Sequence, residues 1–104
     1  MEQIALDRDP NKSFRYTYQN VTYQITLSLG TGKNCLYNIS VNNELVGSGI
    51  ALPGKFLIKY NYHQYGNLFF LDYTDENNYP YYENFGITQF LFVLSQDEVN
   101  EIIL

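Results

Sequence analysis

The stretch FRYTYQNVTYQITLSL, residues 14–29, decides the fold, because its apolar residues recur with a period of two that changes phase once. From residue 21 onward the odd-numbered residues are apolar, whereas before Gln19-Asn20 the even-numbered residues are apolar. Alternation of this kind is typical of a β-strand with one buried face. A two-residue hairpin loop at Gln19-Asn20 brings both apolar sets onto the same face, with Tyr16 opposite Tyr23. The stretch therefore predicts a β-hairpin.

Outward from the hairpin, short strands alternate with turn signals. Residues 30–33 and the pair Asn42-Asn43 are rich in turn formers, and Pro53-Gly54 fits a type II turn. Further strands are predicted at residues 35–41, 45–52, 56–62, 68–73 and 87–94, the last one buried on both faces. About six to eight short strands with regularly spaced turns indicate an all-β fold, either an antiparallel β-sandwich or a small barrel.

The C-terminal residues carry a helix signal. Ser95 and Glu98 have the Ser-x-x-Glu spacing of a capping box, in which each side chain bonds the backbone of the other residue. We therefore expect a short helix over residues 96–103, directly after the last strand.

The composition fits one domain with an aromatic core. The 104 residues are 45% hydrophobic and 16% charged, which predicts a single domain over residues 1–104. The chain has 11 Tyr and 7 Phe but no Trp, and such aromatic residues favour strands. Because Cys35 is the only cysteine, an intramolecular disulfide and a two-cysteine metal or redox motif are excluded.

Charge is divided unevenly along the chain. Residues 1–59 hold all six basic residues and four acidic ones, whereas residues 60–104 hold seven acidic residues and no Lys or Arg. An acidic second half repels phosphate backbones, so direct nucleic-acid binding is not expected. The N-terminal residues lack the apolar run of a signal peptide, and no later stretch reaches the roughly 18 apolar residues of a membrane span. We expect synthesis in the cytoplasm and no membrane association.

The motifs for catalysis and metal binding are incomplete. His63 is the only histidine, and neither Cys35 nor any serine lies in a recognisable nucleophile motif. Counting from Asp72, oxygen-bearing side chains fall at several positions of a calcium loop, but Asn77 stands where that loop requires glycine. We therefore predict no catalytic residue, no metal site, no cofactor and no enzymatic activity.

Tyrosines gather in the predicted loops of the second half. Residues 75–86 form a long loop that crowds three tyrosines around Pro80. Tyrosine suits protein interfaces because its ring offers a large contact area at low entropic cost and its hydroxyl remains available for hydrogen bonds. The alternative is that several of these rings cap the ends of a small aromatic core. We predict a protein interface at Tyr79, Tyr81, Tyr82, Phe85, Tyr62 and Tyr65.

The order of short motifs in the second half of the chain is distinctive. The motifs are Gly49-Ile50-Ala51-Leu52-Pro53-Gly54, Tyr60-Asn61-Tyr62, Gly66-Asn67-Leu68 opening a strand that ends at Asp72, Pro80, and Asn84-Phe85-Gly86 before the last strand. In this order and spacing the sequence resembles the small baseplate plug proteins of contractile-tailed phages. The likeness covers residues 14–94, and residues 95–104 form a C-terminal extension relative to that family.

The resemblance implies a non-enzymatic structural protein of the phage virion. Such a protein sits in the tail baseplate and plugs or seals the lumen of the hub or tube until the tail contracts. The implied partners are the hub, spike and tail tube proteins and copies of the chain itself, and the chain would be made in the cytoplasm of the bacterial host. The residues leave a second function open, a carbohydrate- or ligand-binding β-sandwich module, although the lack of Trp weakens a sugar platform.

Overall fold

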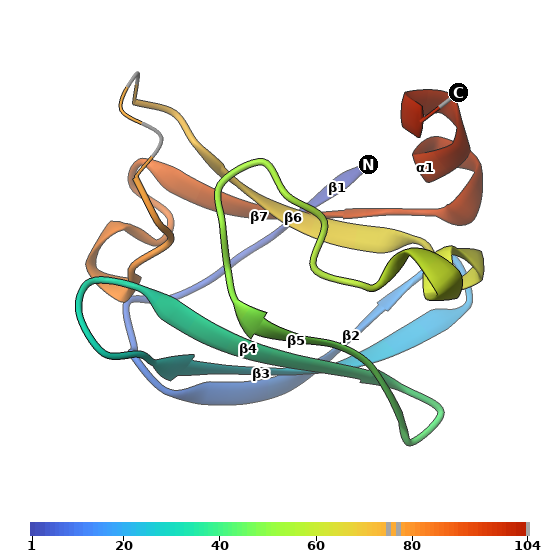
Figure 1. Cartoon of the computed structure of the whole chain (residues 1–104), viewed down its shortest axis with the longest axis horizontal. Helices are drawn as coiled ribbons and strands as arrows, with labels where there is room; N and C mark the ends of the chain where they lie inside the picture. The colour runs from blue at the N-terminus through green and yellow to red at the C-terminus, as the bar shows by residue number, and fades with distance from the viewer. Residues whose placement is uncertain (75, 77, 104) are drawn as a thin grey trace.

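The computed structural model describes residues 1–74, 76 and 78–103, and for residues 63 and 103 it describes only the backbone. In this part of the chain, seven β-strands form two antiparallel sheets that lie face to face and do not close into a barrel (Figure 1). One sheet has the strand order β1-β7-β6, and the other has the order β2-β3-β4-β5. The predicted all-β antiparallel fold is therefore confirmed, in its two-sheet form.

The elements follow one another along the chain, with longer connections before and after β6. The strands are β1 (Glu2–Ile4), β2 (Lys12–Tyr18), β3 (Val21–Leu29), β4 (Cys35–Val41), β5 (Glu44–Ile50), β6 (Asn67–Asp72) and β7 (Gln89–Leu94). The helical elements of the described residues are the 3-10 helices η1 (Tyr60–Tyr65) and η2 (Tyr82–Asn84) and the α-helix α1 (Gln96–Ile103).

Strands β2 and β3 form the predicted hairpin, with Tyr16 opposite Tyr23. Gln19 and Asn20 have positive φ angles of 47° and 69°, as a two-residue type I′ turn requires. Tyr23 is buried, whereas Arg15 points outward and is exposed. The phase switch in the hydrophobic pattern thus predicted the turn, the register and the buried face.

The core lies between the two sheets and is built from their inward-facing side chains. Its largest fully buried members include Tyr23, Phe70, Ile25, Leu27, Ile39, Leu68 and Leu91. Two core tyrosines donate their hydroxyls to backbone carbonyls of the connection between β5 and β6, Tyr23 to Tyr65 and Tyr37 to Leu57. Burial raises the pKa of Tyr23 to about 12, so this hydroxyl remains a donor at neutral pH. These tyrosines belong to the core and fasten it to the connecting segment.

The strand predicted at residues 56–62 is wrong. The Leu57 amide donates to the Leu68 carbonyl of β6, but the Lys59 amide donates to the Val46 carbonyl of β5, each at 2.9 Å. Because successive bonds go to two different sheets, the segment cannot join either sheet as a strand. Instead it links the edges of the two sheets and then turns into η1.

This connection is held by the buried side chain of Asn67. The Asn67 amide accepts the Ile58 N–H at 2.9 Å and donates to the Ile58 carbonyl at 3.1 Å. Gly47 of β5 allows the close approach, because a β-carbon there would collide with the Leu57 carbonyl. The alternation of apolar residues along the sequence does not predict such contacts, because the two residues that form each contact are distant from each other in the chain.

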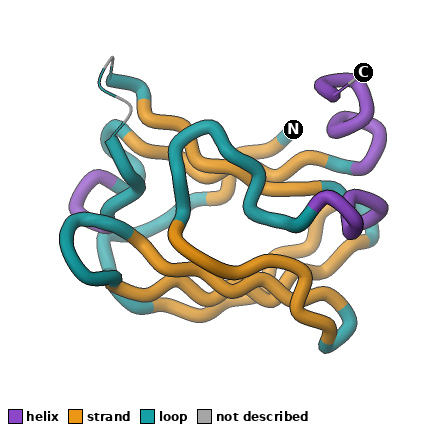
Figure 2. The backbone as a smooth tube through the Cα atoms, viewed as in Figure 1, coloured by secondary structure: helices purple, strands orange, loops and turns teal. Residues whose placement is uncertain are grey.

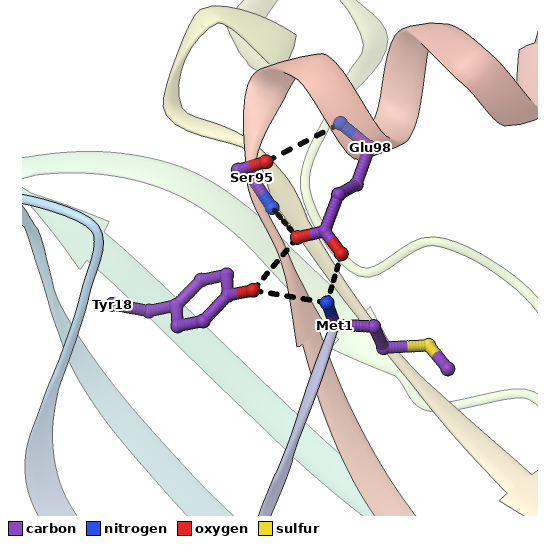
Figure 3. Close-up of polar contacts among 4 residues, drawn as sticks. All are labelled: Met1, Tyr18, Ser95 and Glu98. Carbon is purple, nitrogen blue, oxygen red and sulfur yellow. Dashed lines mark hydrogen bonds and ion pairs between the residues drawn. The ribbon is translucent and has the colours of Figure 1, made fainter.

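The predicted helix forms, and the capping box at its start is present. The Glu98 amide donates to the Ser95 hydroxyl at 3.3 Å, and the Ser95 amide donates to the Glu98 carboxylate at 3.0 Å (Figure 3). The same carboxylate accepts the Tyr18 hydroxyl at 2.8 Å and forms an ion pair with the Met1 amine. Glu98 therefore fastens α1 both to the hairpin and to the residues before β1.

Two loop regions lie at opposite ends of β6, because η1 precedes this strand and η2 follows it. Figure 2 shows them as short helical segments on the right and left of the molecule. Helix α1 follows β7 and lies at the same end as η1 (Figure 1). Among the described residues, none of the helices is long and apolar enough to cross a lipid bilayer.

Candidate functional site

The structure divides the six predicted interface residues between the two ends of the molecule. One group belongs to η1, before β6, and the other belongs to the loop between β6 and β7. The first group is Tyr62 and Tyr65, and the second is Tyr79, Tyr81, Tyr82 and Phe85. The sequence indicated that these residues lie in loops but not that the loops are far apart. We refer to residues 78–85 as the tyrosine loop.

The tyrosine loop is fixed from beneath by the side chain of Gln89, the first residue of β7. Gln89 is 1% exposed, and its amide oxygen accepts the Tyr81 N–H at 2.8 Å. Its amide nitrogen donates to the carbonyls of Asn78 and Tyr79, at 3.2 and 3.0 Å. Since three backbone groups of the loop are bonded to one buried amide, the described part of the loop is held from within the chain.

Asp72 closes the base of the same loop. One carboxylate oxygen accepts the backbone N–H and the hydroxyl of Thr74, and the other accepts the Asn78 N–H at 2.6 Å. Burial acts to raise the pKa of Asp72, but the hydrogen bonds from Thr74 and Asn78 outweigh it, and the pKa lies below its usual value. The Asp72 carboxylate thus accepts hydrogen bonds from donors of the same loop.

The described residues hold no group of three or more His, Cys, Asp or Glu side chains that could bind a metal ion. Asn77, which stands at the glycine position of the calcium-like spacing, lies outside the described residues. Of the oxygen-bearing side chains in that spacing, Asp72 accepts the Thr74 hydroxyl, and Glu76 accepts the side-chain amide of Asn78.

The aromatic rings of the loop form a graded set from solvent to core. Tyr79 is 51% exposed, and Tyr81 and Tyr82 are partly exposed with their ring centroids 4.8 Å apart. Tyr82 packs against the core, and Phe85 is only 2% exposed and stacks on the ring of Phe70. Phe85 therefore supports the loop from the inside, and the surface offered to solvent is that of Tyr79 and Tyr81 with one side of Tyr82.

The two tyrosines of η1 serve mainly to close the other end of the core. Tyr62 and Tyr65 both pack against it, and the Tyr62 hydroxyl donates to the Glu44 carboxylate at 3.3 Å. The negative charge of Glu44 raises the pKa of Tyr62. The Tyr65 carbonyl accepts the Tyr23 hydroxyl, so η1 is tied to two strands of the four-stranded sheet, β3 and β5.

Small-molecule sites are poorly formed on the described surface. The pocket beside Tyr65 has a volume of about 180 Å³, below the roughly 300–1,000 Å³ of typical ligand pockets. A wider hollow of about 520 Å³ lies on the outer face of the second sheet, where its lining includes Arg15, Gln24 and Asn43. The lining of this hollow contains no aromatic ring on which a sugar could stack.

The described side chains include no catalytic pair of a cysteine nucleophile and a histidine base. Cys35 is 3% exposed, and burial raises the pKa of its thiol to about 11, so it is not a reactive thiolate at neutral pH. The side chain of His63 lies outside the described residues.

Sequence reasoning missed Gln89 and Asn67, the two buried amides that hold the loops at either end of β6. Gln89 and its neighbour Thr88 were the two polar side chains within an apolar run that we predicted to be buried on both faces. A polar residue in such a position must find hydrogen-bond partners, and this was the available signal. Its partners are backbone groups of a loop, which no residue pattern specifies.

Comparison with known proteins agrees with the motif order noted above. The search of curated proteins found no match for the chain. A family model described as the cyanophage baseplate Pam3 plug gp18 matches residues 1–97, further in both directions than the resemblance over residues 14–94. The match includes both sheets, the tyrosine loop and Ser95 at the start of α1. The chain therefore belongs to this family of phage baseplate plug proteins.

Proposed function

We propose that this chain is a baseplate subunit that seals the central lumen of the hub or tail tube through protein–protein contacts until the tail contracts. The observation that carries the proposal is the family match over residues 1–97, since the family description names a baseplate plug. A plug acts by occupying space and binding its neighbours, so the role needs no catalytic group. The hub, spike and tail tube proteins, and further copies of the chain, are the partners that such a position offers.

The tyrosine loop is the contact surface that we propose for the plug. Tyr79 and Tyr81 present aromatic area to solvent, while Gln89 holds their backbone in place from inside the chain. A loop that is ordered before binding loses less conformational entropy when a partner docks. The exposed Glu76 and Glu83 lie beside these rings in the sequence and favour a neighbour that carries Lys or Arg.

The large polar hollow on the β2-β3-β4-β5 sheet does not favour the carbohydrate-binding alternative. Its requirement is an aromatic platform beside polar groups, and the large polar hollow on the second sheet has no ring in its lining. We therefore keep the structural role as the single proposal.

The proposal is tested by truncating the exposed tyrosines without touching the core. In the double variant Tyr79→Ser and Tyr81→Ser, the β-sheet circular dichroism spectrum of the purified chain should be unchanged. Recovery of the variant in purified phage particles should fall, because interface anchors commonly contribute about 2 kcal/mol or more, a factor of about 30 in affinity. Tyr82 is retained because its ring packs against the core.

Leu36→Ser is the matched control, since Leu36 is an exposed apolar residue on the outer face of β4 and is not part of the tyrosine loop. This variant should enter particles at the wild-type level. Full recovery of the tyrosine double variant would show that the loop is not the contact surface, and a lost β-sheet spectrum would place these rings in the core.

A further inference from the structure

The outer face of the β1-β7-β6 sheet is aromatic where a solvent-facing sheet is normally polar. Register places Phe69 opposite Phe92 and Leu71 opposite Phe90, so these four side chains share one side of the sheet. The intervening residues of both strands point the other way into the core. Tyr73, just after β6, continues the row. We call Phe69, Leu71, Tyr73, Phe90 and Phe92 the outer aromatic face.

The rings of the outer aromatic face contact one another and not the main core. Phe69 and Phe92 are stacked with centroids 5.7 Å apart, and Tyr73 and Phe90 lie 4.7 Å apart. None of the five residues belongs to the core cluster between the sheets or packs against it. Tyr73 is 63% exposed, Phe69, Leu71 and Phe90 are partly exposed, and Phe92 is buried, with 8% of its surface exposed. A contiguous aromatic surface of this kind on a small domain marks an interaction site.

The other sheet of the same molecule shows what an uncovered outer face looks like. On its outer side Ser13 bonds Thr26 at 3.2 Å, and Thr17 bonds Thr22 at 2.8 Å across the β2–β3 hairpin. Polar side chains there are paired with each other and face solvent. The outer face of the four-stranded sheet is thus polar over the β2–β3 hairpin, with Leu36, Leu45 and Ile50 exposed on β4 and β5, whereas the outer face of the β1-β7-β6 sheet is aromatic along both β6 and β7. This asymmetry indicates that the outer aromatic face, and not the polar face of the hairpin, is covered by a partner.

Acidic groups flank the outer aromatic face at the two ends of its strands. Exposed Glu76 lies in the loop after β6, and exposed Asp97 and Glu101 lie on α1 after β7. Because β6 and β7 are antiparallel, these two segments stand at opposite ends of the sheet (Figure 1). Lys55 and Lys59 lie beside the β6 edge, in the connection that bonds β6, and not at the strand ends.

The acidic groups at the strand ends indicate which kind of protein can bind the outer aromatic face. If two copies of the chain packed these faces with aligned strands, an acidic end of one sheet would lie over an acidic end of the other in either orientation. Like charges facing each other oppose such a pair. A different protein, with an apolar centre and Lys or Arg at the margins that meet the strand ends, complements both the rings and the carboxylates.

We propose that the outer aromatic face is a docking surface for a second, non-identical protein with an apolar contact patch flanked by basic side chains. The argument for the surface rests on the structure alone, and its assignment to a baseplate neighbour rests on the proposed function. This surface is distinct from the tyrosine loop, so one subunit would contact neighbours on two sides. That arrangement suits a subunit held in place by its surroundings.

Site-specific photocrosslinking tests this assignment. The photoreactive residue p-benzoylphenylalanine is placed at Phe90 or Leu71 in the phage-encoded chain, and at exposed Asn38 on the outer face of β4 as the control. Infected cells and purified tails are irradiated, and the linked peptides are identified by mass spectrometry. Circular dichroism of each purified variant verifies that the fold is retained.

We expect Phe90 and Leu71 to link to one non-identical protein, at a segment with Lys or Arg beside apolar residues, and Asn38 to give no such product. Combining Glu76→Lys, Asp97→Lys and Glu101→Lys should reduce the yield about tenfold or more, because like charges then face each other across the interface. Products that contain only copies of this chain, or a yield no higher than that of Asn38, would overturn the proposal. If the crosslinked protein is not a component of the tail, the proposed baseplate function is contradicted. The outer aromatic face would still be a docking surface for a non-identical protein.

Discussion

Two buried amides, Asn67 and Gln89, hold the irregular segments at the two ends of the β6–β7 pair. Each side chain bonds backbone groups of a segment that is not itself a strand of either sheet, Ile58 in one case and the tyrosine loop in the other. Removal of such an amide leaves buried backbone groups unpaired, which costs about 1–3 kcal/mol. The shape of the proposed contact loop therefore depends on a residue that does not itself touch a partner.

Gln89→Ala should lower the free energy of unfolding by about 1–3 kcal/mol, because the Tyr81 amide and the Tyr79 carbonyl lose their partner. Urea denaturation measures the loss, and hydrogen exchange should show faster exchange at Tyr81. The exposed Gln64→Ala is the matched control and should change stability by less than about 0.5 kcal/mol. Unchanged exchange at Tyr81 in the Gln89 variant would show that the loop is held by other contacts.

The buried thiol of Cys35 provides a test of the core packing. Its pKa is raised to about 11 by burial, against about 8.5 for a free thiol, so at pH 8 the folded chain holds far less thiolate. Alkylation by iodoacetamide at pH 8 should be at least about a hundredfold slower in the native chain than in guanidinium chloride. Equal rates would place the thiol at the surface and contradict the core described here.

Among the secondary-structure elements, the β2–β3 hairpin carries a local strain that sequence reasoning did not foresee. Gln19 adopts a φ of 47°, in the left-handed region that costs most L-residues about 1–2 kcal/mol. The equivalent turn between β4 and β5 uses Asn42 and Asn43, with φ of 53° and 65°, and Asn tolerates this region better.

Gln19→Asn with Asn20→Gly should raise the free energy of unfolding by about 0.5–1 kcal/mol, because Asn-Gly is the favoured type I′ pair. Thermal unfolding followed by circular dichroism measures the change. Asn43→Gly in the second turn is the control, and its gain should be smaller because the first position there is already Asn. A loss of stability in the first turn would contradict the assigned turn type.

The elements that the sequence predicted correctly are those whose determinants are close together in the chain. The β2–β3 hairpin needs only an alternation and a two-residue turn, and the start of α1 needs only Ser95 and Glu98. The strand predicted at residues 56–62 failed because its backbone partners, Leu68 and Val46, lie on different sheets. Periodicity reports which side of a segment is buried but not what the segment bonds to.

The candidate site shows the same limit. The sequence predicted that Tyr79 and Tyr81 lie in a loop, and the structure places them there, partly or largely exposed. It could not separate them from Phe85, which is buried on Phe70, because loop residues have no period that reports burial. The outer aromatic face could not be predicted for another reason. An apolar run in a strand predicts that both faces are buried, but it does not distinguish burial within the chain from burial by a partner.

At the scale of the whole molecule, aromatic surface and negative charge are concentrated in the half that contains β6, β7 and α1. The two proposed contact regions, the tyrosine loop and the outer aromatic face, both belong to this half, while the β2–β3 hairpin of the other sheet presents polar side chains. In this arrangement, neighbouring proteins would contact the tyrosine loop and the outer aromatic face, and the polar outer face of the β2–β3 hairpin would point away from them. Membership of the plug family makes the baseplate the place to look for those neighbours.

The most direct test of the plug role is a cryo-EM reconstruction of the intact, uncontracted particle. If the chain is the plug, density for the two-sheet fold should lie in the central baseplate and span the lumen, with the tyrosine loop and the outer aromatic face each against a neighbouring subunit. An open lumen, with the chain absent or bound only at the periphery of the baseplate, would contradict it.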